Sequence, residues 1–391
     1  MKILLINHFP LTGSGSGVYT ENIANSLTKQ GNDVCVIFPE NQKPNNYNFK
    51  TNPVYFTNDE KIEGAIGFNF PCFTTHPRST KTFYDLTDEE LNIYIGAFKK
   101  AIEEEIEIFK PDIIHCGHIW LLADIAGNYN IPLVITAHGT DLIGYDKSEK
   151  IRKSAVCAAK KAKYIITISK ENEKLVEEIY PFAKTIRIPN GYNDEVFYKE
   201  ELDKNEVLKE LGINKNYKNI VSFAGKFTHF KGIDIILKAA KEYQNGDTAT
   251  ILAGNGELFE KMNDMARELE LNNIYFLGNK PHNVLRKLYN IADVSLVPSR
   301  KEAFGLVVIE AMACGAPVIG TNDGGIRDII TKETGVLINP EDEKALASNI
   351  IKILNNDIKF DRDLIAKYTK EKYAQDNFTK KLLEIYFKAI N

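Results

Sequence analysis

Short strand-like runs alternate with helical patterns along this chain, and no other feature limits its fold as strongly. Helical patterns such as 17–29 and 88–109 separate several of the runs. Strands that alternate with helices are typical of a doubly wound parallel sheet. In the first half the runs are KILLIN, DVCVIF, DIIHC, PLVITAH and YIITIS.

The same alternation begins again after IRIPNGYNDEVF at 186–197. The second set of runs is NIVSFAG, TATILAG, NIYFLG, DVSLVPS, PVIGT and GVLI. A length of 391 residues exceeds one ordinary core. Pro189, Asn190 and Gly191 supply turn chemistry between the sets. We therefore expect an α/β protein of two Rossmann-like domains, 1–188 and 189–371, facing a cleft at the carboxyl ends of their strands.

The segment from about 41 to 85 breaks this pattern. It is rich in Asn, Thr and Pro and reads as irregular structure. A lid, a substrate loop and plain connecting structure all remain open for it.

Charge and cysteine content limit the partners. The 49 basic and 53 acidic residues nearly balance, which argues against nucleic acid as the main partner. Five scattered cysteines without a CxxC pattern indicate free thiols in a reducing cytoplasm. The apolar run at 3–6 is too short for a signal peptide or a transmembrane segment, so we expect a cytoplasmic protein.

The run EAFGLVVIE at 302–310 carries the clearest chemical signal. Glu310 lies in an apolar helical pattern, where a carboxylate is costly unless it is hydrogen-bonded. Ligand hydroxyls would remove that cost. Glu302 precedes the helix, beside backbone N–H groups that could hold a phosphorylated, polyhydroxylated ligand. The alternative is a capping Glu followed by a partly exposed helical Glu. The N–H groups belong to Phe304, Gly305 and Leu306.

Further candidates follow other strands of the second half. AGKFTHFKG at 224–232 places Lys226 and Lys231 at a helix entry, where two ammonium groups suit a diphosphate. Two exposed surface lysines are the alternative. Backbone-lined walls of a base and ribose pocket are predicted at GNGE and GNKP. Gly254, Asn255, Gly256 and Lys280 belong to these two runs, and Gly225 of the AGK run is a further candidate contact with the donor.

In the first half, TGSGSGV at 12–18 joins a strand to a helix and lets backbone approach a ligand. Thr20 fills the third glycine position of a dinucleotide motif, so an NAD site is disfavoured. His138 ends a strand and could donate to a sugar hydroxyl, although a histidine satisfied by backbone carbonyls is as good an interpretation. The remaining candidates, left structural or unassigned, are His76, His115, His118 and His229.

The order of these motifs resembles the retaining GT-B glycosyltransferases of the large family that contains sucrose-phosphate, mannosyl-phosphoinositide and N-acetylglucosaminyl-malate synthases. AGK…KG, GNGE, ADVSLVPSRKEAFGLVVIEAMACGAPVIGT and the glycine pair at 324–325 carry the resemblance. It implies that residues 372–391 form a last helix crossing back onto the first domain.

The resemblance also implies roles. Glu302 and the backbone after it would hold the donor sugar, Glu310 the ribose, and Lys226 and Lys231 the diphosphate. His138 would line the donor sugar beside the acceptor. The loop of Gly15, Ser16 and Gly17 would lie near the phosphates. Two departures are Lys226, where the family commonly has Arg, and Ser14, which replaces a glycine.

We expect transfer of a hexosyl group, glucose or N-acetylglucosamine, from a UDP-sugar to a hydroxyl of a small-molecule or glycan acceptor. Retention is expected by a same-face mechanism, with no metal and no cofactor besides the UDP-sugar co-substrate. A sugar-nucleotide epimerase, a phosphorylase and a non-catalytic nucleotide-sugar-binding protein stay open, as does a homodimer. Candidate acceptor contacts are Arg78, Thr140 and Arg152.

Overall fold

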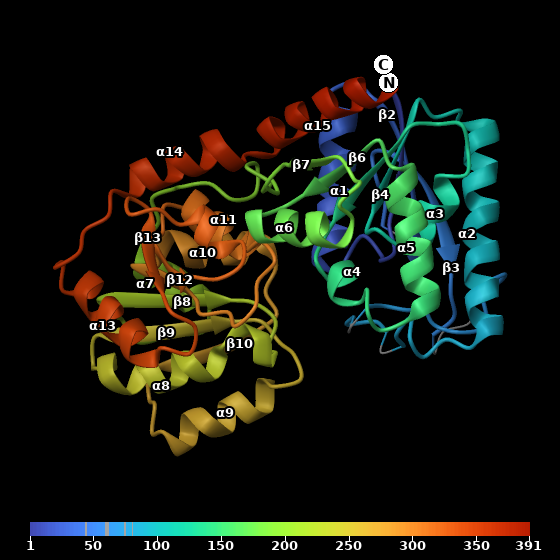
Figure 1. Cartoon of the computed structure of the whole chain (residues 1–391). Helices are drawn as coiled ribbons and strands as arrows, with labels where there is room; N and C mark the ends of the chain where they lie inside the picture. The colour runs from blue at the N-terminus through green and yellow to red at the C-terminus, as the bar shows by residue number, and fades with distance from the viewer. Residues whose placement is uncertain (44, 59–61, 74–75, 80) are drawn as a thin grey trace. The chain divides into compact units, whose positions relative to one another are not determined.

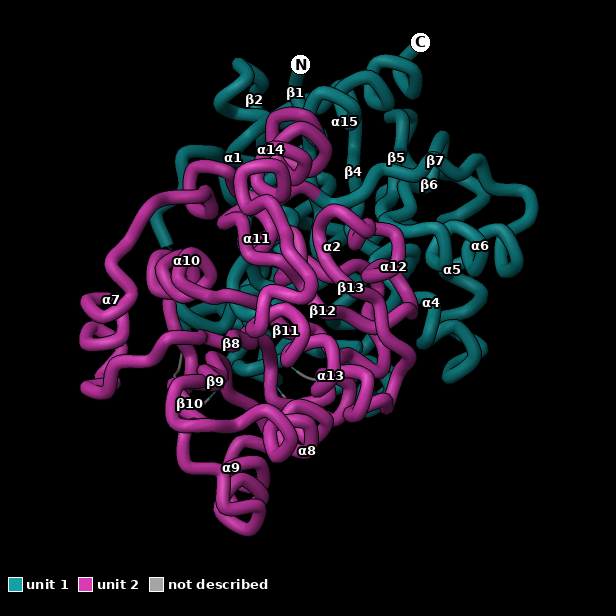
Figure 2. The backbone as a smooth tube through the Cα atoms, turned by 90° about the vertical axis from the view of Figure 1, so that its left-hand side faces the viewer, with its two compact units in different colours: residues 1–190, 378–391 teal, residues 191–377 magenta. Residues whose placement is uncertain are grey.

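The computed structural model describes residues 1–43, 45–58, 62–73, 76–79 and 81–391. The chain forms two compact units, shown in Figure 2. Unit 1 contains residues 1–190 and 378–391, and unit 2 contains residues 191–377. The turn at Pro189 to Gly191 therefore coincides with the passage from one unit to the other.

Unit 1 is built on a seven-stranded sheet with the order β3-β2-β1-β4-β5-β6-β7. All its pairs are parallel. The strand order reverses between β1 and β4, the topological switch point where open α/β sheets bind ligands. The strands are β1 (Lys2–Ile6), β2 (Asp33–Glu40), β3 (Lys50–Tyr55), β4 (Ile113–Gly117), β5 (Leu133–Ala137), β6 (Tyr164–Thr167) and β7 (Thr185–Arg187).

Both faces of this sheet are buried. Leu4 and Ile6 of β1 pack in one hydrophobic cluster, and Ile3 and Leu5 pack in another. Successive strand residues point to opposite faces, so the unbroken apolar run KILLI fits a strand covered on both sides. The helices of unit 1 before its return segment are α1 (Gly15–Lys29), α2 (Asp88–Ile108), α3 (Leu121–Ala126), α4 (Thr140–Ile143), α5 (Glu149–Lys161) and α6 (Lys170–Ile179).

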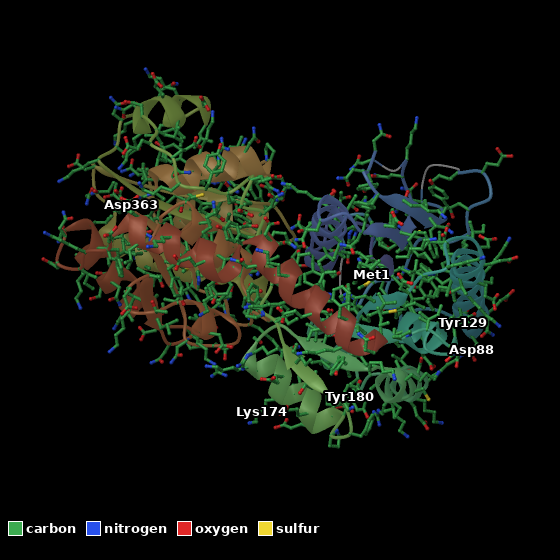
Figure 3. The ribbon with its side chains drawn as sticks, turned by 90° about the horizontal axis from the view of Figure 1, so that it is seen from above. Met1, Asp88, Tyr129, Lys174, Tyr180 and Asp363 are labelled. Carbon is green, nitrogen blue, oxygen red and sulfur yellow. The ribbon has the colours of Figure 1, made fainter. Side chains whose placement is uncertain are left out.

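Helix α2 begins at the residue that the sequence predicts. Thr87 accepts a hydrogen bond from the Glu90 N–H, and the Glu90 side chain accepts from the Thr87 N–H, which is a capping box. Figure 3 shows Asp88 beside this start and Lys174 of α6 on the outer surface.

Among the described helices, none has the length and apolar character that a membrane crossing requires.

Part of the segment at 41–85 was read wrongly from the sequence. It contains β3, which pairs with β2 in the register Phe38↔Pro53. A proline cannot donate to a sheet ladder, and it is tolerated here because β3 is an edge strand. Buried aromatic residues of the same segment, Phe56, Phe70, Phe73 and Phe83, join the core of unit 1. Pro44, residues 59–61 and 74–75, and Thr80 of the HPRST run lie outside the described residues.

Unit 2 is a six-stranded parallel sheet with the order β10-β9-β8-β11-β12-β13, and its switch point lies between β8 and β11. Its strands are β8 (Asn219–Ala224), β9 (Thr248–Ala253), β10 (Ile274–Gly278), β11 (Val294–Val297), β12 (Val318–Thr321) and β13 (Gly335–Ile338). Its helices are α7 (Lys204–Glu210), the 3-10 turn η1 (His229–Lys231), α8 (Ile233–Tyr243), α9 (Phe259–Glu268), α10 (His282–Ile291), α11 (Leu306–Ala313), α12 (Ile326–Ile329), α13 (Glu343–Leu354) and α14 (Arg362–Tyr373).

The last helix, α15 (Gln375–Ile390), returns the chain to unit 1, as Figure 1 shows in red. Its apolar residues Phe378, Leu382 and Tyr386 join the same hydrophobic cluster as α1. The Tyr386 hydroxyl lies 2.6 Å from His115 Nδ1 of β4. Helix α15 therefore completes the packing on one face of the sheet of unit 1. It begins three residues after the expected start at 372.

Candidate functional site

Charged side chains gather in the two loops that leave the switch point of unit 2. One loop follows β8 and contains Lys226 and Lys231, and the other follows β11 and contains Arg300 and Glu302. The structure brings Lys231 and Glu302 together as an ion pair between Nζ and a carboxylate oxygen. Their side chains are 25% and 16% exposed, so both remain within reach of a ligand.

Gly232 ends the lysine loop in the left-handed region, with φ of 68°. A Cβ at this position would lie 2.2 Å from the Pro298 carbonyl oxygen. Both the backbone angle and the close approach therefore require glycine. This contact holds the loop after β8 against the loop after β11 and so places Lys231 beside Glu302.

The Arg300 side chain links the same region through several hydrogen bonds. Its guanidinium donates to both carboxylate oxygens of Asp234 at 2.8 and 2.7 Å and to the His229 carbonyl oxygen at 2.7 Å. It also donates from Nε and Nη2 to Glu341. The hydrogen bonds that Arg300 donates to Asp234 raise the pKa of Arg300 above its usual range. Burial alone would raise the pKa of Asp234, but the contacts with Arg300 hold that pKa below its ordinary value.

The glycine motifs of unit 2 serve close contacts between loops. A Cβ on Gly254 would lie 1.8 Å from the Gly225 carbonyl oxygen, and one on Gly256 would lie 2.6 Å from that of Phe227. The Phe227 N–H donates to the Asn255 carbonyl oxygen at 2.9 Å. The bare faces of Gly254 and Gly256 are thus occupied by protein backbone, and the prediction that these residues form pocket walls stays untested.

The glycine pair of the motif supports Glu302. The Gly325 N–H donates to the Glu302 carbonyl oxygen at 3.0 Å, and a Cβ on Gly324 would lie 2.0 Å from that oxygen. A Cβ on Gly325 would lie 2.4 Å from the Phe304 Cα. The pair therefore fixes the backbone that leads into α11.

Helix α11 begins at Leu306, after Gly305 with φ of 103° and after the buried Phe304. Among the described residues, no hydrogen bond or ion pair reaches the Glu310 carboxylate. Burial raises the pKa of Glu310 to about 7. The neighbouring Tyr289 hydroxyl is buried and also lacks a hydrogen-bond partner within the described part of the chain. Glu310 is partly exposed, which agrees with the alternative of a partly exposed helical Glu, so its carboxylate is open to hydroxyl groups of a ligand.

Two further predicted residues of unit 2 lie on the surface of their loops. Lys226 is exposed, and its carbonyl oxygen accepts from the Thr228 N–H at 2.9 Å. Lys280 is partly exposed after β10. Their predicted contacts with the donor remain predictions.

In unit 1, His138 follows β5 and packs edge to face with Tyr19, with ring centroids 4.8 Å apart. Burial, with a smaller effect of His118, lowers the pKa of His138 to about 3. The next loop is ordered by the buried Asp141, whose carboxylate accepts from the N–H groups of Gly139 at 2.8 Å and Ile119 at 2.9 Å. The sequence contained Asp141 in the HGTD run but gave no signal of this role.

Residues 14–17, at the start of α1, serve two purposes. The Ser14 hydroxyl accepts from the Gly17 N–H at 3.1 Å and caps the helix. A Cβ on Gly17 would lie 2.1 Å from the Pro10 carbonyl oxygen, so this glycine is needed for packing. No described atom lies within 4 Å of a Cβ built on Gly15, which leaves that position open to a ligand. Ser16 is buried between them.

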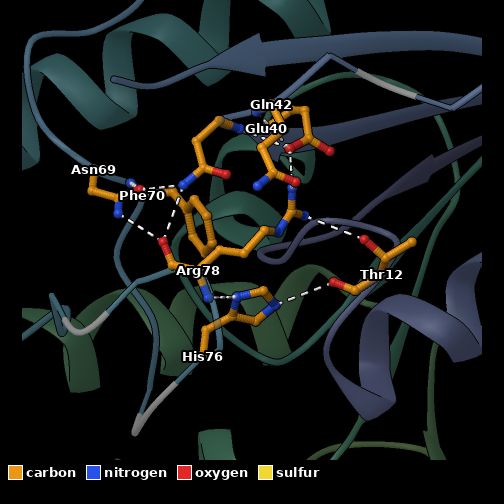
Figure 4. A network of polar contacts seen from close by, with 8 residues as sticks. Thr12, Glu40, Gln42, Asn69, Phe70, His76 and Arg78 are labelled. Carbon is orange, nitrogen blue, oxygen red and sulfur yellow. Dashed lines mark hydrogen bonds and ion pairs between the residues drawn. The ribbon is translucent and has the colours of Figure 1, made fainter. Parts of the chain in front are cut away.

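Arg78 belongs to a polar network that links the 41–85 segment to the glycine loop (Figure 4). Its Nη1 lies 2.5 Å from the buried carboxylate of Glu40 and 3.1 Å from Gln42 Oε1. The Arg78 N–H donates to His76 Nδ1, so His76 Nε2 is the nitrogen that donates to the Thr12 carbonyl oxygen at 3.2 Å. Arg78 thus has a carboxylate partner inside the protein.

The other two acceptor candidates lie elsewhere in unit 1. Arg152 pairs with Asp146 at 3.1 Å and lies over the Tyr145 ring. Thr140 is the first residue of α4. The contacts of Arg78 and Arg152 do not connect them to each other or to Thr140. The predicted role of the three residues in acceptor binding stays untested. In the described part of the chain, no cluster of three or more His, Cys, Asp or Glu residues is arranged to bind a metal ion.

Two units, each built on a parallel sheet with its own switch point, are the architecture of the GT-B fold. Residues 13–196 match the family Glycosyltransferase Family 4, and residues 203–372 match Glycosyl transferases group 1. The two matches together span most of the chain, which is therefore a glycosyltransferase with a Family 4 domain followed by a group 1 domain. This confirms the family, the fold class and the transferase activity expected from the sequence.

Individual proteins agree with this assignment. An uncharacterized glycosyltransferase of Methanocaldococcus jannaschii is 27% identical, over 99% of this chain and 98% of the relative. The N-acetyl-alpha-D-glucosaminyl L-malate synthase of Bacillus anthracis is 26% identical, over 91% of this chain and 89% of the relative. Among solved structures, Anabaena HepE in complex with UDP has a TM-score of 0.75 at 18% identity, covering 98% and 99% of the two chains.

Proposed function

We propose that this glycosyltransferase moves a hexosyl group from a UDP-sugar to a hydroxyl of a small-molecule or glycan acceptor, with retention at the anomeric carbon. The observation that carries the proposal is the Glu310 carboxylate, which has no hydrogen-bond donor among the described residues. A vicinal diol such as a ribose provides two donors for one carboxylate. Glu310 lies on the helix that follows Glu302, so nucleoside and sugar contacts would come from α11 and the loop before it.

The charged loops supply the rest of the chemistry. In the reaction, the bond between the anomeric carbon and the diphosphate oxygen breaks, and the acceptor oxygen forms a new bond on the same face. The acceptor proton passes to the leaving diphosphate. Lys226, Lys231 and the N–H groups at the start of α11 stabilise the charge that develops on that diphosphate. No metal ion or further cofactor takes part in this scheme.

Two relatives support the choice of donor. The Bacillus anthracis relative is named for transfer of an N-acetylglucosaminyl group, and HepE is solved with UDP. We therefore favour UDP-glucose or UDP-N-acetylglucosamine. The scattered cysteines support action in the cytoplasm.

The proposal is tested by thermal shift with UDP-, ADP- and GDP-sugars, followed by product analysis. A UDP-sugar at about 100 times its dissociation constant should stabilise the protein by about 2.7 kcal/mol. NMR of the product should show the anomeric configuration of the donor, and turnover should persist in EDTA. An inverted product, or stabilisation only by ADP- or GDP-sugars, would contradict the proposal. A donor converted without any acceptor would indicate an epimerase, and binding without turnover or hydrolysis would indicate a binding protein.

A further inference from the structure

A second cluster of polar side chains lies where the central strands of unit 1 end. Asn7 and His8 follow β1, His118 follows β4, and His138 follows β5. Ile6 of β1 is in register with Cys116 of β4, and the His118 N–H donates to the Thr136 carbonyl oxygen at 2.8 Å. The cluster therefore spans the topological switch point of unit 1.

Four polar atoms in this cluster are buried and have no hydrogen-bond partner among the described residues. Leaving a buried polar atom unpaired costs about 1–3 kcal/mol. Four such atoms in one place mark a site that a ligand can satisfy. The atoms are Asn7 Oδ1, His8 Nε2, His118 Nδ1 and His138 Nε2.

The rings of this cluster are in contact. The His118 centroid lies 4.7 Å from that of His138 and 5.8 Å from that of His8. His118 adopts φ of 77°, a left-handed conformation that is uncommon outside glycine. Asn7, His8 and His118 are fully buried, whereas His138 is partly exposed. A ligand would therefore meet the cluster on the side of His138.

His115 provides an internal contrast. It lies on β4, is buried like His118, and has a protein partner for each ring nitrogen: Tyr386 Oη at 2.6 Å and Thr136 Oγ1 at 2.8 Å. A histidine that serves the core of this unit is thus fully hydrogen-bonded. His118 and His138 depart from that pattern at the edge of the same sheet.

We infer that Asn7, His118 and His138 bind a hydroxyl group of the acceptor, and that the part of the acceptor held there is an uncharged polyol. This inference rests on the proposed function. An amide oxygen and neutral imidazoles accept from and donate to a hydroxyl group. Burial is the main cause that lowers the pKa of both His118 and His138 to about 3, so neither ring is a cation at neutral pH. The buried carboxyl group of Asp141 beside His138 also disfavours an anionic group.

Gly117 sets the space available in the cluster. A Cβ on this residue would lie 2.9 Å from Asn7 Oδ1 and 3.6 Å from His138 Nε2. Gly117 therefore lies against two of the unpartnered atoms, and its contact with Asn7 Oδ1 leaves no room for a Cβ. A methyl group introduced there would displace the Asn7 amide, which is one of the groups in the cluster.

The test measures steady-state kinetics of the whole protein with its best UDP-sugar and a panel of acceptors. The panel pairs uncharged sugars and cyclitols with their phosphorylated and carboxylated counterparts. Wild type should prefer the uncharged members. His118→Asn and Gly117→Ala should each raise the acceptor KM at least about tenfold, which corresponds to about 1.4 kcal/mol. The donor-induced thermal shift should stay unchanged.

His115→Asn is the matched control, because it also truncates a buried histidine, in this case one within β4. It should lower the melting temperature more than His118→Asn and leave the acceptor KM unchanged, since it breaks two protein hydrogen bonds. An unchanged KM in His118→Asn, or turnover of only the phosphorylated and carboxylated acceptors, would overturn the inference. Absence of any donor-induced thermal shift would instead overturn the proposed function.

Discussion

The two units carry opposite chemistry at the same topological position. At the switch point of unit 2, Lys231, Glu302 and Arg300 are charged and paired. At that of unit 1, His118 and His138 are neutral and lack partners for one ring nitrogen each within the described chain. The fold supplies the place, and the side chains decide the ligand: paired charges suit a diphosphate, and neutral donors and acceptors suit hydroxyl groups.

Burial favours the uncharged form of the titratable groups at both switch points. It raises the pKa of Glu310 to about 7 and lowers the pKa of His118 to about 3. In each case desolvation disfavours the charged form. The acid and the imidazoles therefore contribute opposite slopes to the pH dependence of stability.

The largest expected effect concerns the paired charges at the switch point of unit 2. Arg300→Met should lower the free energy of unfolding by about 3–5 kcal/mol, because it leaves Asp234 without its guanidinium partner. Chemical denaturation measures the change. Arg267→Met is the matched control, since Arg267 and Asp264 form an exposed pair and its loss should cost less than about 1 kcal/mol. Equal losses in the two variants would show that Arg300 is no more than a surface pair.

Lys231→Ala should lower kcat/KM for the UDP-sugar about 10²–10³-fold, because one donor to the leaving diphosphate is lost. Steady-state kinetics with a fixed acceptor measures this change. Lys241→Ala changes an exposed lysine on the following helix and should leave the rate unaltered. Unchanged turnover in Lys231→Ala with every donor would refute the charge-stabilisation scheme.

Glu310→Gln should stabilise the ligand-free protein by up to about 3 kcal/mol above pH 7. The folded state holds the Glu310 proton up to about pH 7, whereas the unfolded state releases it near pH 4.5. The contribution of Glu310 to stability is thus fully present below pH 4.5 and is lost as the pH rises to 7. Unfolding of both proteins across this range measures the difference.

The same substitution should weaken donor binding. Glu268→Gln, at an exposed position of α9, should change neither property. A variant that is both more stable and equally able to bind UDP would remove Glu310 from the donor site.

The buried histidines at the switch point of unit 1 give stability the opposite pH dependence. His118 titrates near 6.5 in the unfolded chain and at about 3 in the folded protein. Its contribution is present above pH 6.5 and falls as the pH drops toward 3, by about 2 kcal/mol at pH 5. His118→Asn should therefore lose less stability between pH 7 and 5 than wild type. Parallel curves would show that His118 is charged in the folded protein.

Arg152→Ala should give the smallest effect. The Arg152–Asp146 pair is exposed and contributes less than about 1 kcal/mol. With an uncharged acceptor, KM should stay within about twofold, which the same kinetic assay measures. A tenfold rise would restore Arg152 as an anchor for an acidic acceptor and weaken the contrast between the units.

The sequence predicted much of the fold and the charged loops at the switch point of unit 2. The apolar runs of β1, β4 and β5 marked their strands because buried parallel strands are continuously apolar. The edge strand β3 was missed because Asn52 and Pro53 lower its strand propensity, and pairing with β2 overrides that preference. Lys231 and Glu302 were predicted because they occur in ordered motifs, and the structure pairs them.

Other site residues gave only a weak signal. Arg300 stood inside a recognised motif, but five hydrogen bonds to three separate segments are invisible in a linear sequence. Asn7 and His118 follow strands, and the rule for topological switch points could have selected them once the strand order was known.

The sequence by itself determined the alternating elements, the passage between units near residue 190, and the position of Lys226, Lys231 and Glu302 in strand-end loops. These depend on local periodicity and turn chemistry. Only the tertiary structure decided that Lys231 pairs with Glu302, that Glu310 meets no donor, and that Asn7 lies near Gly117. Those facts arise from strand register and burial, which join residues far apart in the chain.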